Sequence, residues 1–196
     1  MILIHLFFSF TLPLKPIYLI PGFGDSPIYS QVMNPFLYPE CPSNISKIPI
    51  QNGKTLNNNF LSAYPSCAAK LLRIYYNKTT GRAHQLPFIV TNSVSSYDPA
   101  IFYDAFADIM NKIKEFGYIN NINLFGVVYN YYFHPATSNT VYDKLKNQIE
   151  QVYLRTGKKS IFISVDQGTG LSSIFLSNYK PAEWVKKYID SVIFLS

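Results

Sequence analysis

The stretch that decides the fold is Lys158–Phe175, which reads KKSIFISVDQGTGLSSIF. It contains the short apolar run Ile161–Val165, which is typical of a buried strand. The tight sequence Asp166–Gly168 follows at once, and small residues then begin a helix. The stretch therefore predicts a strand, a sharp turn and a helix in direct succession.

This succession is the outline of the nucleophile elbow of α/β-hydrolases, whose usual pattern is Gly-x-Ser-x-Gly. The five corresponding positions are Ser164–Gly168, SVDQG, so Asp166 stands where the nucleophilic serine is expected. Ser164 lies two residues before the turn, inside the strand, and we expect it to pack there. The sequence predicts an α/β-hydrolase-like fold in which an acid occupies the nucleophile position.

Composition indicates one folded domain. The chain has 196 residues, of which 48% are hydrophobic, 16% aromatic and 14% charged, and this excludes a disordered chain. The net charge is +6, with basic residues scattered along the sequence. An ordinary solvated surface explains this charge better than nucleic-acid binding, although weak attraction to anionic lipid headgroups also fits. We expect no cofactor and no metal.

The first segment, Met1–Leu14, is almost wholly apolar and has the length of a secretory signal region rather than of a membrane span. The alternative is a buried first strand. Secretion is favoured by the even cysteine pair and by two glycosylation sequons, which begin at Asn44 and Asn77. We therefore expect residues 1–14 to be a signal peptide and residues 15–196 to form the domain.

A second candidate site element is the segment Pro16–Gly22, which reads as a strand stopped by Pro21-Gly22. A turn at the carboxyl end of a central strand can aim backbone N–H groups into the crevice above a sheet. In hydrolases of this fold, the corresponding loop supplies one donor of the oxyanion hole. The alternative is a plain β-turn.

The segment Tyr29–Ala69 shows no sustained hydrophobic period and is rich in proline and asparagine. A loop of this length is uncommon unless it is a lid or binding loop, so we expect a lid-like insertion at about residues 36–70. A bridge between Cys41 and Cys67 would close roughly 25 residues, worth about 3 kcal/mol. Two free, buried thiols are the alternative.

The remaining segments alternate between strands and helices, which favours a parallel, doubly wound sheet. A helix is expected from an Asp98-Pro99 cap to Gly117, with its apolar face at Phe102, Phe106, Ile109, Met110, Ile113 and Phe116. A second helix is expected over Val141–Thr156. Strands are expected at Leu71–Tyr76, Leu86–Val90, Asn123–Tyr129 and Ser191–Leu195. Because the last element is a strand, we expect the domain to be truncated at its C-terminus.

The ordered set of motifs resembles the lecithin:cholesterol acyltransferase family, which includes lysosomal phospholipases and phospholipid:diacylglycerol acyltransferases. The resemblance extends over nearly all of the chain and corresponds to the N-terminal part of such proteins. The stretches that carry it are Pro16–Gly22, the Cys41 and Cys67 pair, Tyr76–Gly81, Leu124–Tyr129, the helix Tyr142–Gly157, the elbow and Trp184–Ser196.

The resemblance implies a secreted or lumenal enzyme of lipid metabolism that transfers or hydrolyses phospholipid acyl esters at a membrane surface. It implies Phe23 and Gln167 as backbone donors of the oxyanion hole, and Asp166 at the nucleophile position. A Cys41–Cys67 disulfide would pin the lid that contacts lipid. The partner would be a phospholipid or a membrane surface, and the oligomeric state is left open.

Two departures from the family pattern concern the chemistry. The family has Tyr-Asp-Trp-Arg where this chain has Tyr129–Tyr132, YNYY, and the acid and base of the triad would lie beyond Ser196. We therefore expect an acyltransferase-like protein that is inactive or impaired. One alternative is a non-catalytic secreted module that binds lipid or protein. Another is a hydrolase in which Asp166 attacks a saturated carbon, with His84 or His134 as its base.

Overall fold

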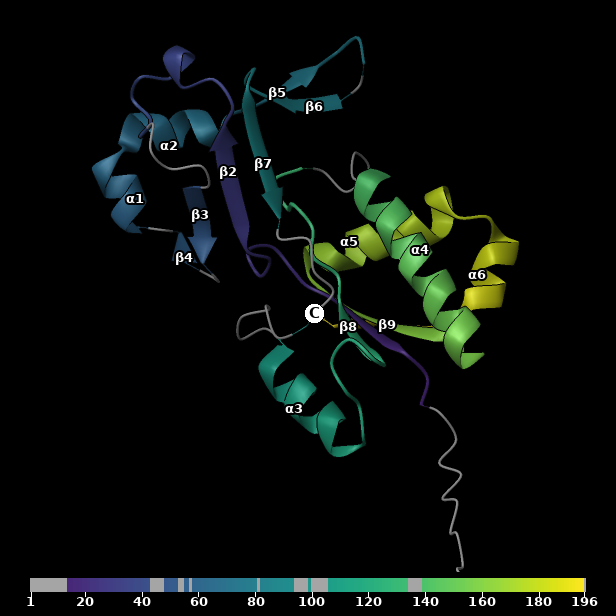
Figure 1. Ribbon diagram of the computed structural model, residues 1–196. Helices are drawn as coiled ribbons and strands as arrows, with labels where there is room; N and C mark the ends of the chain where they lie inside the picture. The colour runs from purple at the N-terminus through teal and green to yellow at the C-terminus, as the bar shows by residue number, and fades with distance from the viewer. Residues whose placement is uncertain are drawn as a thin grey trace, which may run out of the picture.

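The computed structural model describes residues 14–42, 48–52, 55–56, 58–80, 82–93, 99, 106–133 and 139–195. Within these ranges the molecule combines a parallel sheet flanked by helices with a smaller antiparallel unit (Figure 1). Residues 1–13 of the expected signal peptide and Asp98 of the expected cap fall outside the described residues, as do Asn44 and His134. The expected α/β fold class is confirmed.

The parallel sheet has the strand order β10-β9-β1-β8. Its strands are β1 (Ile17–Ile20), β8 (Leu124–Gly126), β9 (Ser160–Val165) and β10 (Ile189–Leu195). All three pairings are parallel, with Ile17 opposite both Leu124 and Ile161. Strands β1 and β9 are central and nearly wholly buried, which explains their continuous apolar sequences.

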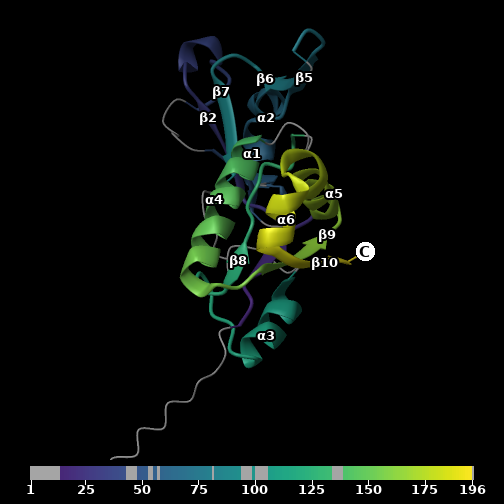
Figure 2. The same ribbon diagram turned by 90° about the vertical axis from the view of Figure 1, so that its right-hand side faces the viewer.

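Helices cover both faces of this sheet, as Figures 1 and 2 show. On one face, Ile17 and Leu19 of β1 pack with Phe106 and Met110 at helix α3 (Ala107–Glu115). On the other, Tyr18 packs in a core with three helices and an intervening π-helix. These are α4 (Asn139–Thr156), α5 (Gln167–Ile174), η5 (Phe175–Tyr179) and α6 (Ala182–Tyr188). Successive side chains of a strand point to opposite faces, so β1 joins both cores.

The smaller unit is built on an antiparallel sheet with the strand order β4-β3-β2-β7. Its strands are β2 (Ile28–Val32), β3 (Ile48–Asn52), β4 (Thr55–Leu56) and β7 (Ile89–Ser93). The unit also contains a 3₁₀ turn, two short helices and a hairpin. These are η1 (Pro35–Leu37), α1 (Asn58–Ala63), α2 (Pro65–Leu71), and strands β5 (Ile74–Asn77) and β6 (Arg82–Gln85). We call residues 28–93 the antiparallel module.

A disulfide between Cys41 and Cys67 ties this module together, with the two Cα atoms 4.9 Å apart. The expected bridge is therefore confirmed, and the alternative of two free thiols is wrong. Both cysteines are buried in a cluster with Tyr38, Ile48 and Phe60. The bridge joins the segment after η1 to helix α2, so it fixes the position of a segment that has little regular structure of its own.

Three expectations need correction. The segment Tyr29–Ala69 is not a structureless loop, because it contributes most of β2, strands β3 and β4, and helices α1 and α2. The expected strand Leu71–Tyr76 corresponds to β5, which pairs with β6, whereas the expected strand Leu86–Val90 overlaps β7, which pairs with β2. Phe116 is 69% exposed, since helix α3 ends at Glu115 and Gly117 turns the chain with φ 87°.

The helix expected at Val141–Thr156 is confirmed as α4, and its apolar face carries Tyr142, Leu145, Ile149 and Val152. None of the helices in the described part of the chain is long and apolar enough to cross a membrane. Helix α5 begins directly after β9 and packs beside the end of β1, at the edge of the sheet where both strands terminate.

Because α5 lies so close to β1, we expect Gly168→Ala to lower the stability of the protein strongly. A Cβ atom at residue 168 would lie 2.4 Å from the carbonyl oxygen of Ile20 and 2.5 Å from that of Pro21. The backbone carbonyl groups of Ile20 and Pro21 cannot move away easily. We therefore expect the free energy of unfolding in urea to fall by about 2 kcal/mol or more. Gly170→Ala is the matched control, because nothing lies within 4 Å of its Cβ position. An equal effect of both substitutions would contradict this packing.

Candidate functional site

The elbow places Asp166 between the end of β9 and the start of α5. Its backbone has φ 48° and ψ −123°, a conformation that non-glycine residues rarely adopt. The Thr169 backbone N–H and hydroxyl both donate to the Asp166 carbonyl oxygen, at 2.9 and 2.7 Å. The side chain of residue 166 is exposed at the tip of the turn, as expected for a nucleophile elbow.

The loop after β1 meets the Asp166 side chain directly. The backbone N–H of Phe23 donates to Oδ2 of Asp166 at 3.1 Å. This contact needs a glycine at residue 22, because a Cβ atom there would lie only 2.9 Å from Cβ of Asp166. The structure therefore brings the expected oxyanion donor Phe23 to Asp166, and the carboxylate accepts its hydrogen bond.

The second expected donor, Gln167, is the first residue of α5. Its side-chain amide donates to the carbonyl oxygen of Tyr131 at 3.2 Å and thereby joins the elbow to the loop after β8. The role of its backbone N–H as an oxyanion donor stays a prediction.

A buried tyrosine supports the oxyanion loop, and sequence reasoning did not single it out. The Tyr129 hydroxyl donates to the carbonyl oxygen of Pro21 at 2.8 Å. Burial raises the pKa of Tyr129, and the nearby carboxylates of Asp166 and Asp25 raise it further. The hydroxyl therefore stays protonated at neutral pH and remains a donor. The only signal in the sequence was a polar aromatic loop after the strand that contains Tyr129.

The rest of that loop connects the elbow to the antiparallel module. The ring of Tyr131 contacts the ring of Phe23 edge to face, with centroids 4.7 Å apart. Asn130 donates from its side-chain amide to the Thr91 carbonyl oxygen at 2.8 Å, and its side-chain oxygen accepts from the Tyr132 N–H at 3.1 Å. Neutral hydrogen bonds and ring contacts thus occupy the positions at which the family carries charged residues.

The other candidates lie apart from the elbow tip or remain untested. Ser164 is fully buried, with its hydroxyl 2.6 Å from that of Ser172, so it is not an exposed nucleophile. His84 lies on β6 and stacks on Tyr75 within the hairpin. The Asn77 side chain accepts hydrogen bonds from the N–H groups of Thr79 and Thr80, and its glycosylation stays a prediction.

The described residues contain no cluster of three or more His, Cys, Asp or Glu side chains that could hold a metal ion. At the elbow, the Asp166 side chain accepts the Phe23 N–H and the Asp166 carbonyl oxygen accepts the Thr169 hydroxyl. Phe23 itself is 61% exposed.

Comparison with known proteins agrees with this geometry. The family model for lecithin:cholesterol acyltransferase matches residues 56–196, which include the elbow, Cys67 and the Tyr129–Tyr132 loop. A search of curated proteins found no match. The match covers well over half of the chain, and the described structure has the α/β architecture expected from the sequence. The chain belongs to the lecithin:cholesterol acyltransferase family.

Proposed function

We propose that this chain is a family member that has lost acyl-ester chemistry at its elbow and that binds phospholipid surfaces without turning them over. The observation that carries this proposal is the hydrogen bond from the Phe23 N–H to the Asp166 carboxylate. A donor that an ester hydrolase would direct at the developing oxyanion is here occupied by a carboxylate oxygen.

The chemistry of a carboxylate nucleophile supports the loss of ester turnover. Attack by Asp166 on an acyl ester would form a mixed anhydride and would have to expel an alkoxide. The alkoxide is a far worse leaving group than the attacking carboxylate, so the tetrahedral intermediate collapses back to the ester. Aspartate nucleophiles are suited instead to displacement at a saturated carbon, which is not the chemistry of acyl transfer.

Electrostatics adds a second barrier even if another group were to attack. Two unit charges about 4 Å apart repel by about 4 kcal/mol at an effective dielectric constant of about 20. An oxyanion formed beside the Asp166 carboxylate would meet a repulsion of this order. Such a penalty corresponds to roughly a thousandfold loss of rate. The single change from serine to aspartate thus removes the nucleophile and opposes the transition state.

We expect the purified protein to release no fatty acid above the blank from phosphatidylcholine vesicles. The measurement is product release over time, with Asp166→Asn as the matched variant because it removes the charge and keeps the shape. Turnover by the unaltered protein that Asp166→Asn abolishes would contradict the proposal, since it would make Asp166 a working nucleophile.

The distribution of charge supports a lipid surface as the partner. Residues 41–97 contain six lysines and arginines and no aspartate or glutamate, so their formal charge equals the +6 of the whole chain. The rest of the chain is neutral overall. Among the described residues of this segment, Arg73 and Lys78 are exposed at the β5–β6 hairpin beside Tyr75 and Tyr76. Basic side chains interleaved with tyrosines suit the surface of an anionic membrane.

Exposed apolar side chains lie at the same end of the molecule. Phe36 of η1 is 95% exposed, and Met33, Leu37 and Phe88 are each more than half exposed. In both Figures 1 and 2, the turn that carries Phe36 and the β5–β6 hairpin lie at the end of the molecule opposite α3. The Met33 N–H donates to the Phe88 carbonyl oxygen at 2.8 Å, which holds these two apolar residues next to each other.

The proposed docking surface therefore comprises the apolar residues Met33, Phe36, Leu37 and Phe88 together with the basic hairpin. The disulfide beneath it suits a secreted or lumenal protein, because disulfides persist in oxidising compartments. Apolar side chains would enter the interface while Arg73 and Lys78 contact anionic headgroups. Each basic residue near such a surface is worth about 1 kcal/mol, so the attraction is sensitive to salt.

We expect the protein to sediment with vesicles that contain phosphatidylserine and to bind pure phosphatidylcholine vesicles more weakly. Arg73→Glu with Lys78→Glu should weaken binding to anionic vesicles by about tenfold or more. Lys144→Glu with Lys159→Glu is the control, because it makes the same charge change at exposed positions outside the module. The proposed surface would be contradicted if both double variants lost affinity for anionic vesicles equally. It would also be contradicted if the protein bound vesicles with and without phosphatidylserine equally well.

A further inference from the structure

A cleft of about 530 Å³ opens beside the elbow, at the carboxyl ends of β9 and β10. This volume lies within the range of about 300–1,000 Å³ that is usual for small-molecule sites. Its lining residues come from β9, the elbow, α5 and β10, and they are Val165, Asp166, Thr169, Ser173, Phe194 and Leu195. Three of the six are large apolar side chains, and Asp166 is the only charged one.

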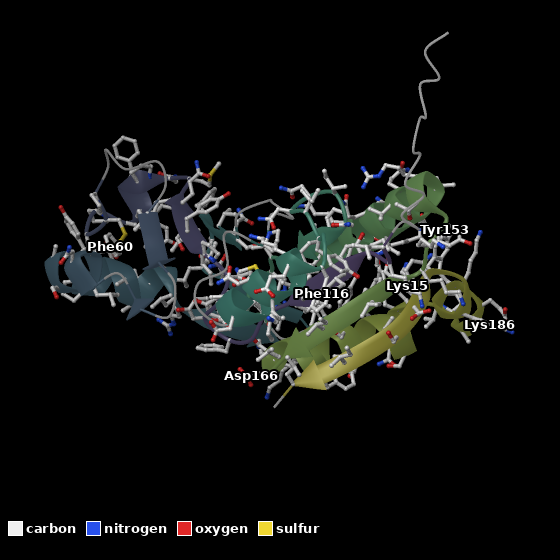
Figure 3. The ribbon with its side chains drawn as sticks, turned by 90° about the horizontal axis from the view of Figure 1, so that it is seen from below. Lys15, Phe60, Phe116, Tyr153, Asp166 and Lys186 are labelled. Carbon is white, nitrogen blue, oxygen red and sulfur yellow. A yellow bond between two sulfur atoms is a disulfide. The ribbon has the colours of Figure 1, made fainter. Side chains whose placement is uncertain are left out.

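The Asp166 carboxylate has no cationic partner among the residues that the structure describes. The four ion pairs in those ranges are formed by Lys15, Lys70, Lys112 and Lys146 with other acids. Figure 3 shows Asp166 at the carboxyl-terminal tip of β10, whereas Lys15 and Lys186 lie toward the other end of that strand. The Phe23 N–H donates to Oδ2, so the carboxylate has further acceptor capacity at the cleft.

The two hydroxyl groups of the cleft are also oriented as acceptors. The Thr169 hydroxyl donates its proton to the Asp166 carbonyl oxygen at 2.7 Å. The Ser173 hydroxyl donates its proton to the Thr169 carbonyl oxygen at 2.8 Å. Each oxygen retains lone pairs and has no further proton to give. Among the described residues that line the cleft, the polar side chains thus offer acceptors and no donor.

From this arrangement we infer that the cleft binds a single-chain amphiphile with a primary ammonium headgroup. The ammonium group has three N–H donors and a positive charge, which match the Asp166 carboxylate and the hydroxyl oxygens of Thr169 and Ser173. The alkyl chain lies along Val165, Phe194 and Leu195. A fatty carboxylate finds no side-chain donor among the described lining residues and is repelled by Asp166.

This binding site inverts the preference of an esterase elbow. A serine at residue 166 would leave the Phe23 N–H free for an anion, whereas the aspartate satisfies that donor and presents a negative charge. The inference shares one assumption with the proposed function, namely that Asp166 acts as a charged group and not as a nucleophile. It requires neither a membrane nor the docking surface of the antiparallel module.

The test is isothermal titration calorimetry at neutral pH with dodecylammonium, kept below its micelle-forming concentration. We expect one binding site per chain, and at least about tenfold weaker binding of dodecanoate, which has the same chain length. Asp166→Asn should weaken dodecylammonium binding by at least about tenfold, because it removes the charge and keeps the size. Asp108→Asn, at an exposed acid on α3, is the matched control and should bind as the unaltered protein does.

Two further measurements separate the headgroup from the chain. Phe194→Ala should weaken dodecylammonium binding and leave the weak binding of butylammonium unchanged, because only the long alkyl chain reaches Phe194. Equal affinity for dodecanoate and dodecylammonium would overturn the inference, and so would unchanged dodecylammonium binding in Asp166→Asn. Since no vesicles are used, failure of vesicle docking would leave this result intact, and ester turnover would be detected separately as released fatty acid.

Discussion

The hydrogen bond between the Phe23 N–H and the Asp166 carboxylate is the contact around which the elbow is built. It exists only because two strands that are distant in the sequence lie side by side, with Ile20 opposite Ser164. Two glycines permit the approach, since Gly22 leaves room for the Asp166 side chain and Gly168 lets α5 pack against the end of β1. Tyr129 holds the intervening loop through Pro21. These contacts place an acid at the turn between β9 and α5.

The parts of this site that the sequence predicted are local. The strand, turn and helix of Ser160–Ile174 lie within one continuous stretch, so the position of Asp166 and the neighbouring helix α4 followed from short patterns. The antiparallel module was missed because its pairings are not local: Tyr29 of β2 lies opposite Asn92 of β7. For the same reason, no pattern indicated that Tyr129 would reach Pro21 or that Asn130 would reach Thr91.

The two halves of the molecule carry different physical properties. The parallel sheet has a conventional core on each face and keeps the elbow geometry, including the positive φ of Asp166. The antiparallel module holds the disulfide, exposed apolar side chains and a formal charge of +5, from six lysines and arginines and Glu40. The elbow carries an aspartate, and the antiparallel module carries a basic and apolar surface. These two features support the proposal that the protein binds lipid surfaces and does not process esters.

The central claim is that the Asp166 carboxylate occupies the amide donor that an esterase would use for the oxyanion. The most direct measurement is the rate of hydrogen exchange at the Phe23 amide, followed by ¹H–¹⁵N NMR at a single pH in the unaltered protein and in Asp166→Ala. We expect this exchange to be at least about tenfold faster in Asp166→Ala, because the hydrogen bond to the carboxylate protects the amide. Equal exchange rates of the Phe23 amide in the two proteins would contradict the claim.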